Sequence, residues 1–595
     1  MRVLFHPEFP RDVQRFQADY SQISQTLGAR FRAEVDQAVE AIRAAPTAAG
    51  HRFNIGSKIV PELRRRNLRA FPRGFRGFRK CRIATGRRKL YIANSEMPDA
   101  QSIEPRPMFS ERLKRYIPLA VWGIAVLTIL LIPLKIVSYG YIPDDDALRH
   151  AAKAVSGKPW SEILVMRSDF PLDFHQGWHA ILGWIHRSLN ADAETLVVMS
   201  VVSLMVLVSL SALVWLRRPE AWLAALMAGC IASPVIISRL TFGRPFLFTM
   251  AVFITLLFVW SRPEDTQPRL SNLLASVALM AAAAWIHGSA WYLFVLPAGA
   301  LILAGLGRSA IYYLGCWVAG SFLGASLTGH PWQFLSQSLR LLFQAFGTND
   351  LARQLVSEFL PSTGDYAAVL LVVAMLLWRA RNPEWKAQEL LNPVFLMCVI
   401  GWMLGLKIIR FSVDWALPAL LVWLALEFQK HFEDYVPFDS WKRLLVTVGL
   451  AGGAFLATTS DVGSRWTWNM TTQYLTAESP ELAGWMPEKD GVVYTGDMEV
   501  FYFTFFKNPN APWRYVLGFE PALMRPDDLA ILRKLSWNFG DLRAYEPWIK
   551  KMRPQDRLIL RASYSHLAGR PNIPELEWFF AANDYWIGRL PRATK

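Results

Sequence analysis

The sequence predicts a mainly α-helical polytopic membrane protein with a small α+β module before its membrane core and an α/β domain after it. Three observations predict this fold class. The 595 residues are 53% hydrophobic and include 25 Trp. The mean hydropathy is +0.20. About 11 to 13 apolar segments follow residue 115. Soluble globular chains are normally less apolar than this.

Residues 1–95 form the predicted N-terminal module, and residues 96–115 form a basic linker. Residues 1–115 hold 24 Lys and Arg against 11 Asp and Glu, so they carry 13 of the net charge of +16. A short apolar start at 3–5 precedes two stretches of helical periodicity, and Pro46 ends the second. The periodic apolar positions are Val13, Phe16, Tyr20, Ile23, Phe31, Val35, Val39 and Ile42.

Residues 116–459 form the predicted membrane core, since a membrane-spanning helix needs about 20 largely apolar residues. Cationic flanks stay on the cytoplasmic side. Because Arg112, Lys114 and Arg115 precede the first run, we expect the N-terminus inside and the loop at 138–176 outside. The apolar runs are 116–137, 177–189, 195–216, 220–238, 245–260, 271–287, 289–306, 310–328, 366–378, 394–409, 412–428 and 443–459.

Three consecutive carboxylates, Asp144, Asp145 and Asp146, follow the first apolar run. Adjacent carboxylates repel each other, so at least one should have a raised pKa, and the group can share a proton or bind a divalent cation. A carboxylate in this position can also take a proton as a general base. Further charged and titratable groups crowd the same loop: Arg149, His150, Lys153, Lys158, Arg167, Asp169, Asp173, His175 and His179.

Residues 460–595 are predicted to form an α/β domain. Residues 492–494, 515–517 and 557–560 have the composition of strands, and 526–535 has that of a helix. In the preceding core, residues 334–346 form an amphipathic run that suits the membrane interface. The four cysteines are widely spread and indicate neither a disulfide framework nor a metal cluster. The chain has no phosphate-binding glycine loop, zinc pattern or nucleophile elbow, which argues against ATP-driven transport and against hydrolysis by those routes.

The order of features after residue 116 follows a recognisable plan. It consists of the acidic loop after the first helix, then Phe174, His175, Gln176, Gly177, Trp178 and His179, then Gly243, Arg244 and Pro245, then Trp285, Ile286, His287 and Gly288, and last Arg410, Phe411 and Pro418. This plan resembles the GT-C superfamily of membrane glycosyltransferases. Members of that family often end in an outside domain, which favours an odd number of crossings and an extracytoplasmic domain at 460–595.

The resemblance implies transfer of a sugar from a polyprenyl-phosphate carrier to an acceptor on the outer face of a bacterial-type plasma membrane. Asp144 or Asp145 is the expected general base. Arg244 and Arg410, with Lys407 as an alternative, can neutralise the leaving phosphate. The expected partners are a lipid-linked sugar and bilayer lipids, with no nucleic acid and no cofactor beyond a divalent cation at 144–146. The other expected substrate-binding residues are Asp146, His175, His179 and His287.

Each of these residues also has a structural interpretation. One of the three aspartates can cap the helix that Ala147 begins. The arginines can be membrane anchors or ion-pair partners. His175 and His179 have the spacing of two metal ligands on one helix face, with Asp173 as a third. A transporter or flippase is the alternative function, although the two-halved symmetry of broken helices typical of transporters is not visible.

The N-terminal module has a resemblance of its own. It rests on Val3, Leu4, Phe5, His6, Pro7 and Glu8, then Leu27, Gly28, Arg30, Phe31, Glu34 and Val35, and then Arg65, Arg66, Asn67, Leu68, Arg69, Ala70, Phe71 and Pro72. These residues resemble the RelE/ParE toxin family, which implies a helical hairpin on a small antiparallel sheet. The basic, glycine-containing run at 73–80 departs from the apolar strands of that family. A degenerate module is therefore expected, with a membrane-tethered toxin as an alternative.

Overall fold

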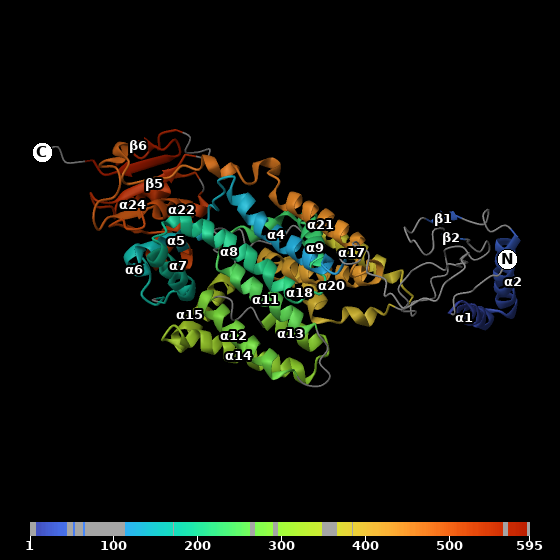
Figure 1. Ribbon diagram of the computed structural model, residues 1–595. Coiled ribbons are helices and arrows are strands. Elements are labelled where there is room, and N and C mark those ends of the chain that lie inside the picture. Colours follow the sequence, from blue (N-terminus) through green and yellow to red (C-terminus); the bar gives the residue numbers. More distant parts are fainter. Residues whose placement is uncertain are drawn as a thin grey trace. The chain divides into compact units, whose positions relative to one another are not determined.

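The computed structural model describes residues 8–44, 51–53, 63–65, 114–170, 172–261, 268–288, 295–347, 366–383, 385–538, 540–562 and 569–591. The chain divides into two compact units, Met1–Pro107 and Met108–Lys595. Most described residues are helical, and a small sheet lies near the C-terminus (Figure 1).

The first unit contains the predicted helical hairpin, α1 (Glu8–Ile23) and α2 (Gln25–Ala44). The two helices bury apolar side chains against each other, and the rings of Tyr20 and Phe31 are 5.0 Å apart. β1 (His51–Phe53) pairs antiparallel with β2 (Leu63–Arg65). The apolar start at 3–5, Pro46, the basic run at 73–80 and the linker up to 113 lie outside the described residues. The toxin resemblance stays a prediction.

Three stretches among the described residues are long and apolar enough to cross a membrane. They are α4 (Ile117–Val137), α8 (Ala193–Leu213) and the 27 residues Ile409–Tyr435. The last stretch joins α19 (Ile409–Phe411), a π-helical turn (Ser412–Ala416) and α20 (Leu417–Tyr435).

Two further apolar stretches are bent pairs of helices. α9 (Glu220–Ala232) and α10 (Pro234–Leu240) meet at 113°, so the run predicted at 220–238 is two helices rather than one. α14 (Arg308–Ser326) and the first part of α15 (Pro331–Gly347) meet at 110°. In both pairs a proline begins the second helix, where its missing N–H costs nothing. α15 covers the predicted amphipathic run at 334–346.

The remaining helices of the core are shorter, or fall outside the length and composition criteria for a crossing. The number of crossings therefore stays a prediction. These helices are α11 (Phe246–Trp260), α12 (Leu270–Ile286), α13 (Val295–Leu303), α17 (Tyr366–Ala380), α18 (Pro393–Gly405) and α21 (Trp441–Thr459).

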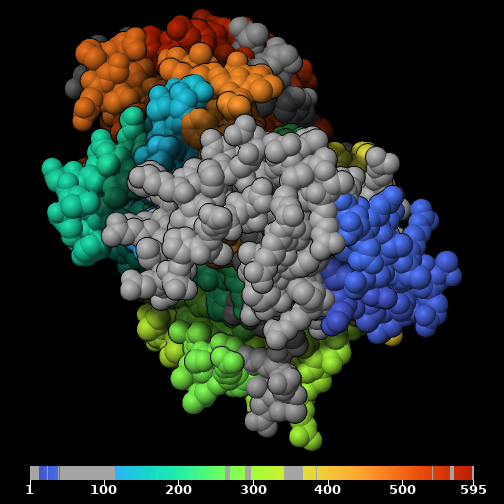
Figure 2. Space-filling view, turned by 45° about the vertical axis from the view of Figure 1, so that its right-hand side comes forward, coloured from blue at the N-terminus to red at the C-terminus, as the bar shows by residue number. Residues whose placement is uncertain are grey.

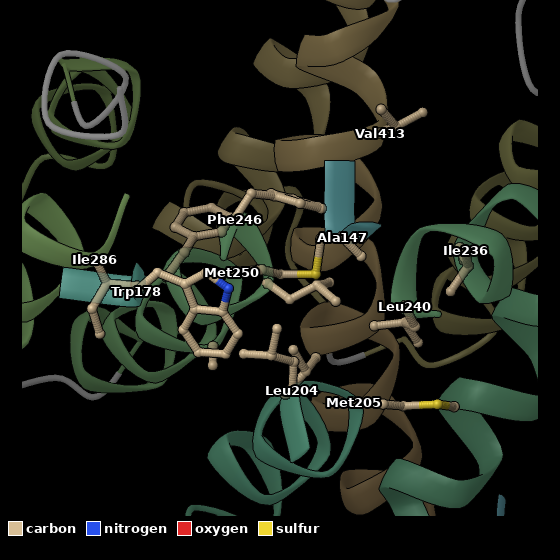
Figure 3. Packing of buried hydrophobic residues seen from close by; sticks show 14 of the residues in the cluster. Ala147, Trp178, Leu204, Met205, Ile236, Leu240, Phe246, Met250, Ile286 and Val413 are labelled. Atoms are coloured by element: carbon tan, nitrogen blue, oxygen red, sulfur yellow. The ribbon is translucent and has the colours of Figure 1, made fainter. Parts of the chain in front are cut away.

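The loop after α4 folds into α5 (Asp146–Ser156), α6 (Trp160–Ile163) and α7 (Gln176–Leu189). α5 packs against α7 and α8. Figure 3 shows the apolar core beneath its first turn, where Ala147 lies near Phe246 and Met250 of α11, Leu204 of α8 and Trp178 of α7. Burial of this face holds the start of α5, and with it the acidic loop, against the helical core.

The C-terminal domain is built on a five-stranded sheet of order β4-β3-β5-β7-β6. β3 is parallel to β4 and β5, whereas β7 is antiparallel to β5 and β6. The strands are β3 (Val492–Tyr494), β4 (Arg514–Tyr515), β5 (Arg557–Arg561), β6 (Glu577–Ala581) and β7 (Tyr585–Arg589), and the helices are α22 (Met498–Lys507), α23 (Pro526–Trp537) and α24 (Glu546–Ile549). The three predicted strands and the predicted helix are present, and β6 and β7 were not predicted.

This domain is joined directly to the loop that follows α4. The backbone N–H of Val165 donates to Tyr515 at 2.8 Å and that of Arg167 to Leu523 at 2.9 Å, so the loop extends the edge of the sheet at β4. Lys158 donates to the backbone carbonyl of Ala511 at 2.7 Å. Figure 2 shows the orange and red domain in contact with cyan residues of the α4 region. The acidic loop and the C-terminal domain therefore lie on the same side of the core.

A buried ion pair joins the N-terminal turns of α9 and α21. Arg443 donates through Nε and Nη2 to the two carboxylate oxygens of Glu220, at 2.6 and 3.0 Å. The two side chains are 0% and 1% exposed. Two parallel hydrogen bonds are the strongest geometry for such a pair. Both charges are therefore compensated within the core.

Candidate active site

The three aspartates of the loop have three different environments. Asp145 caps α5, since its Oδ1 accepts from the backbone N–H of Ala147 at 3.3 Å. Its other oxygen accepts from Nη2 of Arg244 at 2.8 Å. Burial raises the pKa of Asp145, and the charge of Arg244 opposes the rise. Both oxygens of the predicted helix cap are thus engaged.

The turn before α11 brings Arg244 to the aspartates. Gly243 has φ +62°, and a Cβ at this position would lie 3.0 Å from a side-chain carbon of Val201 and 3.5 Å from the Cβ of Ala147. Glycine adopts this left-handed conformation without strain. The absence of a side chain therefore lets the turn approach α5 closely enough for the ion pair with Asp145.

Asp146 is held by three groups from three parts of the chain. Its Oδ1 accepts from Nε of Arg149 at 2.6 Å and from the Tyr502 hydroxyl at 3.0 Å. Nη1 of Arg244 lies 3.9 Å from Oδ2. Burial opposes ionisation, but the charges of Arg149 and Arg244 hold the pKa of Asp146 well below its usual range. Asp146 is therefore an ionised carboxylate, and α22 of the C-terminal domain helps to hold it through Tyr502.

Asp144 differs from both neighbours. Within the described part of the chain, no other residue donates a hydrogen bond to its carboxylate or forms an ion pair with it. Burial raises its pKa, and the charge of Asp145 raises it further, while Arg244 and Arg561 act in the opposite direction. A partly buried carboxyl with a raised pKa and no donor from another described residue has the properties of a general base.

Arg149 is a buried cation with unused donor capacity. It is 3% exposed, and no residue in the described part of the chain forms a hydrogen bond with its Nη1. Its guanidinium carbon lies 3.9 Å from the centre of the Phe519 ring, which is another contact with the C-terminal domain. An unsatisfied buried donor costs free energy, of the order of 1–3 kcal/mol. A bound anion at this position would satisfy it.

Four histidines gather beside α5. The ring centres of His150 and His175 are 4.7 Å apart, and those of His175 and His287 are 5.2 Å apart. Nδ1 of His179 lies 2.5 Å from Oδ2 of Asp173, and its Nε2 lies 2.8 Å from Nδ1 of His150. Burial lowers the pKa of His150 and of His175 well below the usual value. These imidazoles are neutral at pH 7.

Arg410 lies 3.4 Å from Asp414, which Arg239 also contacts at 2.5 Å. Asp414 belongs to the π-helical turn, and such turns are frequent at functional sites. Arg410 is 35% exposed, so part of its side chain is accessible beside this buried pair.

Several of the predicted site residues influence the pKa of His287, which follows α12. After burial, the charge of Arg410 is the largest cause of its lowered pKa, and the charges of Asp146, Arg149 and Arg244 also act on it. Thr249 lies 3.4 Å from its Nδ1. The ion pair of Arg244 with Asp145 brings the turn before α11 to the acidic loop, and the ring of His287 packs beside that of His175.

Asp173, His175 and His179, which have the spacing of metal ligands, contact one another. The described residues contain no group of three or more His, Cys, Asp or Glu side chains placed to hold a metal ion. Asp173 instead accepts from the backbone N–H of His175 at 3.0 Å and contacts the ring of His179. At the acidic loop, Arg149 and Arg244 supply positive charge to the carboxylates.

Two residues of this site were not predicted. Arg149 lies three positions after Asp146, a spacing that places two helical side chains next to each other, so it could have been recognised. Tyr502 is 356 positions from Asp146. No local pattern links them.

No protein-family model and no curated protein sequence matches the chain. Solved structures of a similar fold include two of one archaeal enzyme and one of a mycobacterial enzyme. The apo oligosaccharyltransferase of Archaeoglobus fulgidus matches at 11% identity and a TM-score of 0.47, covering 81% of this chain and 75% of that one. The same enzyme tethered to an acceptor peptide matches at 10% identity and a TM-score of 0.44, covering 81% of this chain and 74% of that one. A mycobacterial arabinofuranosyltransferase matches at 14% identity and a TM-score of 0.44, covering 81% of this chain and 40% of that one.

Proposed function

We propose that this protein is a membrane glycosyltransferase that moves a sugar from a polyprenyl-phosphate donor to an acceptor hydroxyl at the membrane surface. The observation that carries the proposal is the division of roles among three adjacent carboxylates. Asp145 and Asp146 are engaged by Arg244, Arg149 and Tyr502, whereas Asp144 has no donor from another described residue. Asp144 is the general base of the proposed reaction.

The proposed chemistry needs a base on one side of the sugar and a cation on the other. An acceptor hydroxyl is a weak nucleophile, and Asp144 takes its proton as the new C–O bond forms. The bond between the anomeric carbon and the phosphate oxygen breaks at the same time, and the electron pair stays on the phosphate. Arg149, with a buried and unpaired Nη1, is placed to bind that phosphate through charge-assisted hydrogen bonds.

The other predicted residues take supporting roles. Arg244 orients Asp145 and Asp146 and adds positive charge near the leaving group. His175, His287 and Arg410 line the region around the phosphate, where neutral imidazoles can donate hydrogen bonds to substrate. In the proposed orientation the N-terminus is cytoplasmic, and the loop and the C-terminal domain face outward in a bacterial-type inner membrane.

The test is a transfer assay in proteoliposomes with a panel of radiolabelled polyprenyl-phosphate hexoses and pentoses and a mixture of acceptor glycans, lipids and peptides. Asp144→Asn is expected to reduce transfer by about 10²–10⁴-fold, the usual contribution of a general base. Asp169→Asn is the matched control, because Asp169 lies on the same loop and its ion pair among the described residues is with Arg167 at the surface. Full activity of the Asp144→Asn protein would refute the assignment of the base.

Transport of a lipid-linked substrate is the second candidate, because the core contains two sharply bent helix pairs, at 113° and 110°. Broken helices of this kind form the substrate sites of many transporters. Movement of a fluorescent polyprenyl phosphate between leaflets, without any acceptor, would favour this function. Asp144→Asn is expected to leave such movement unchanged if Asp144 serves only as the base for transfer.

A further inference from the structure

Asp173, His179 and His150 form a continuous chain of hydrogen bonds beside the aspartates. Oδ2 of Asp173 contacts Nδ1 of His179 at 2.5 Å, and Nε2 of His179 contacts Nδ1 of His150 at 2.8 Å. His150 is 1% exposed and His179 is 8% exposed. His150 lies one helical turn after Asp146 on α5, so the chain ends on the helix that Asp145 caps.

The hydrogen-bond partners determine the tautomer of each imidazole. Asp173 is ionised because, although burial opposes this, the His179 ring and the backbone N–H of His175 lower its pKa. A carboxylate only accepts, so Nδ1 of His179 carries the hydrogen. Burial lowers the pKa of His179. The neutral ring therefore has a lone pair on Nε2, and Nδ1 of His150 must donate to it. Neutral His150 is thereby left with a basic Nε2.

We propose that Asp173, His179 and His150 are a proton relay whose entry is Nε2 of His150. A proton that arrives forms an Nε2–H bond on His150. The Nδ1–H bond of His150 then breaks, and an Nε2–H bond forms on His179. The lone pairs stay on the nitrogens, and one positive charge results on His179 beside the negative charge of Asp173. The aspartate thus orients the first imidazole and neutralises the imidazolium, as the third member of a catalytic triad does.

The proposal deepens the proposed function and rests on it for the source of the proton. Glycosyl transfer releases the proton of the acceptor hydroxyl, which Asp144 takes first. A second acceptor is useful at that point, because Asp144 must lose the proton before the next turnover. His150 lies on the helix that begins at Asp146, and its ring packs against that of His175.

The surroundings keep the two imidazoles of the relay neutral at rest. Burial is the largest cause of the lowered pKa of both imidazoles, and neighbouring cations add to it. α22, which also packs on α5, contributes Tyr502, but its hydroxyl is taken up by Asp146. Asp173 is therefore the group that favours a proton on His179. The charged and titratable groups facing the two rings are Arg149, Lys153, Asp173, His175 and His287.

The first experiment tests the relay without any transfer assay. The full-length protein contains 10 His, which can be labelled with ¹⁵N in reconstituted vesicles and measured by solid-state NMR. His150→Gln and His179→Gln each remove one signal and so assign the two rings. We expect both rings as Nδ1–H tautomers at neutral pH, with His179 becoming the imidazolium on acidification. An Nε2–H tautomer on either ring would overturn the relay.

Replacement of Asp173 tests its part in the relay. Asp173→Asn removes the anion and should lower the titration midpoint of His179 by about 1–3 pH units, the usual effect of one close opposite charge. Asp173→Glu should restore most of that shift. His186→Gln is the matched control, because His186 lies on the same helix and its hydrogen bond among the described residues is with the carbonyl of Ala191. An unchanged midpoint in folded Asp173→Asn protein would overturn the relay. If that variant does not fold, the tautomers of His150 and His179 in the wild-type protein still decide whether the relay exists.

The second experiment separates failure of the relay from failure of the proposed function. In the transfer assay, Asp173→Asn should lower the plateau rate and move the acid limb of the pH profile to lower pH, because the relay becomes a weaker base. A purely structural role would lower the rate at every pH alike, which would overturn the relay while the transferase function stands. If the wild-type protein transfers no sugar, the proposed function fails, and the tautomer measurement alone decides the relay.

Discussion

Replacement of Arg149 gives the sharpest test of the proposed phosphate site. The side chain is 3% exposed, its Nε binds Asp146 at 2.6 Å, and its Nη1 has no partner. Arg149→Met keeps an unbranched apolar side chain but removes the guanidinium and with it every donor. A hydrogen bond to a charged group contributes about 1.5–3 kcal/mol. Loss of one such bond to the donor phosphate therefore corresponds to about a 10- to 150-fold loss of affinity.

The measurement is the concentration dependence of transfer in proteoliposomes with one labelled polyprenyl-phosphate sugar. Arg149→Met should raise KM for the donor by that factor and should also lower kcat, because charge on the phosphate grows as the bond breaks. The KM and kcat of the Arg149→Lys protein should lie between those of the wild-type and Arg149→Met proteins. An ammonium retains the charge but cannot form the planar fork that also holds Asp146.

Arg167→Met is the matched control. Arg167 is on the same loop, is 26% exposed and pairs with Asp169, so its loss should leave KM and kcat within twofold of wild type. Equal effects of the two replacements would mean that the loop responds to any loss of charge. Unchanged kinetics of a folded Arg149→Met protein would show that the buried Nη1 does not bind the donor.

Three further predictions concern stability and pH. Glu220→Gln leaves Arg443 buried without its carboxylate and should cost about 3–5 kcal/mol of unfolding free energy. By contrast, Glu546→Gln, at an exposed ion pair with Lys550, should change the unfolding free energy far less; chemical unfolding in detergent compares the two variants. Gly243→Ala places a side chain at φ +62° and should therefore lower the unfolding free energy by about 1–2 kcal/mol. It should also reduce transfer, because the added Cβ displaces Arg244. A Gly243→Ala protein with the transfer rate and thermal unfolding of the wild type would contradict both expectations. The pKa of Asp144 is raised in the folded protein, so its stabilising contribution is complete below the unfolded value and is lost as pH rises through the folded value. Asp144→Asn should therefore raise the Tm at pH 7 while reducing transfer by about 10²–10⁴-fold, and a lowered Tm would contradict this direction of the pKa shift.

The sequence predicted the local structure of the site where short-range rules apply. An aspartate before an alanine-rich segment indicated a helix cap, and Asp145 has that role because its oxygen reaches the N–H of Ala147. The break at Ser233 also has a visible cause, since the residue before a proline avoids helical geometry and Pro234 begins a new helix. The β6–β7 hairpin was not predicted because its strands were not recognised within the aromatic residues 577–589.

The roles of the three aspartates required contacts that no local rule supplies. Identical side chains at consecutive positions differ only in which partners reach them. The partner of Asp146 three positions away follows from helix geometry, but Arg244 is 99 positions from Asp145 and Tyr502 is 356 from Asp146. Because these two engage the second and third carboxylates, Asp144 remains the carboxyl with no donor from another described residue. The proposed base is thus selected by partners from α22 and from the turn before α11. A change in either partner should redistribute protons among the aspartates even though it leaves their sequence intact.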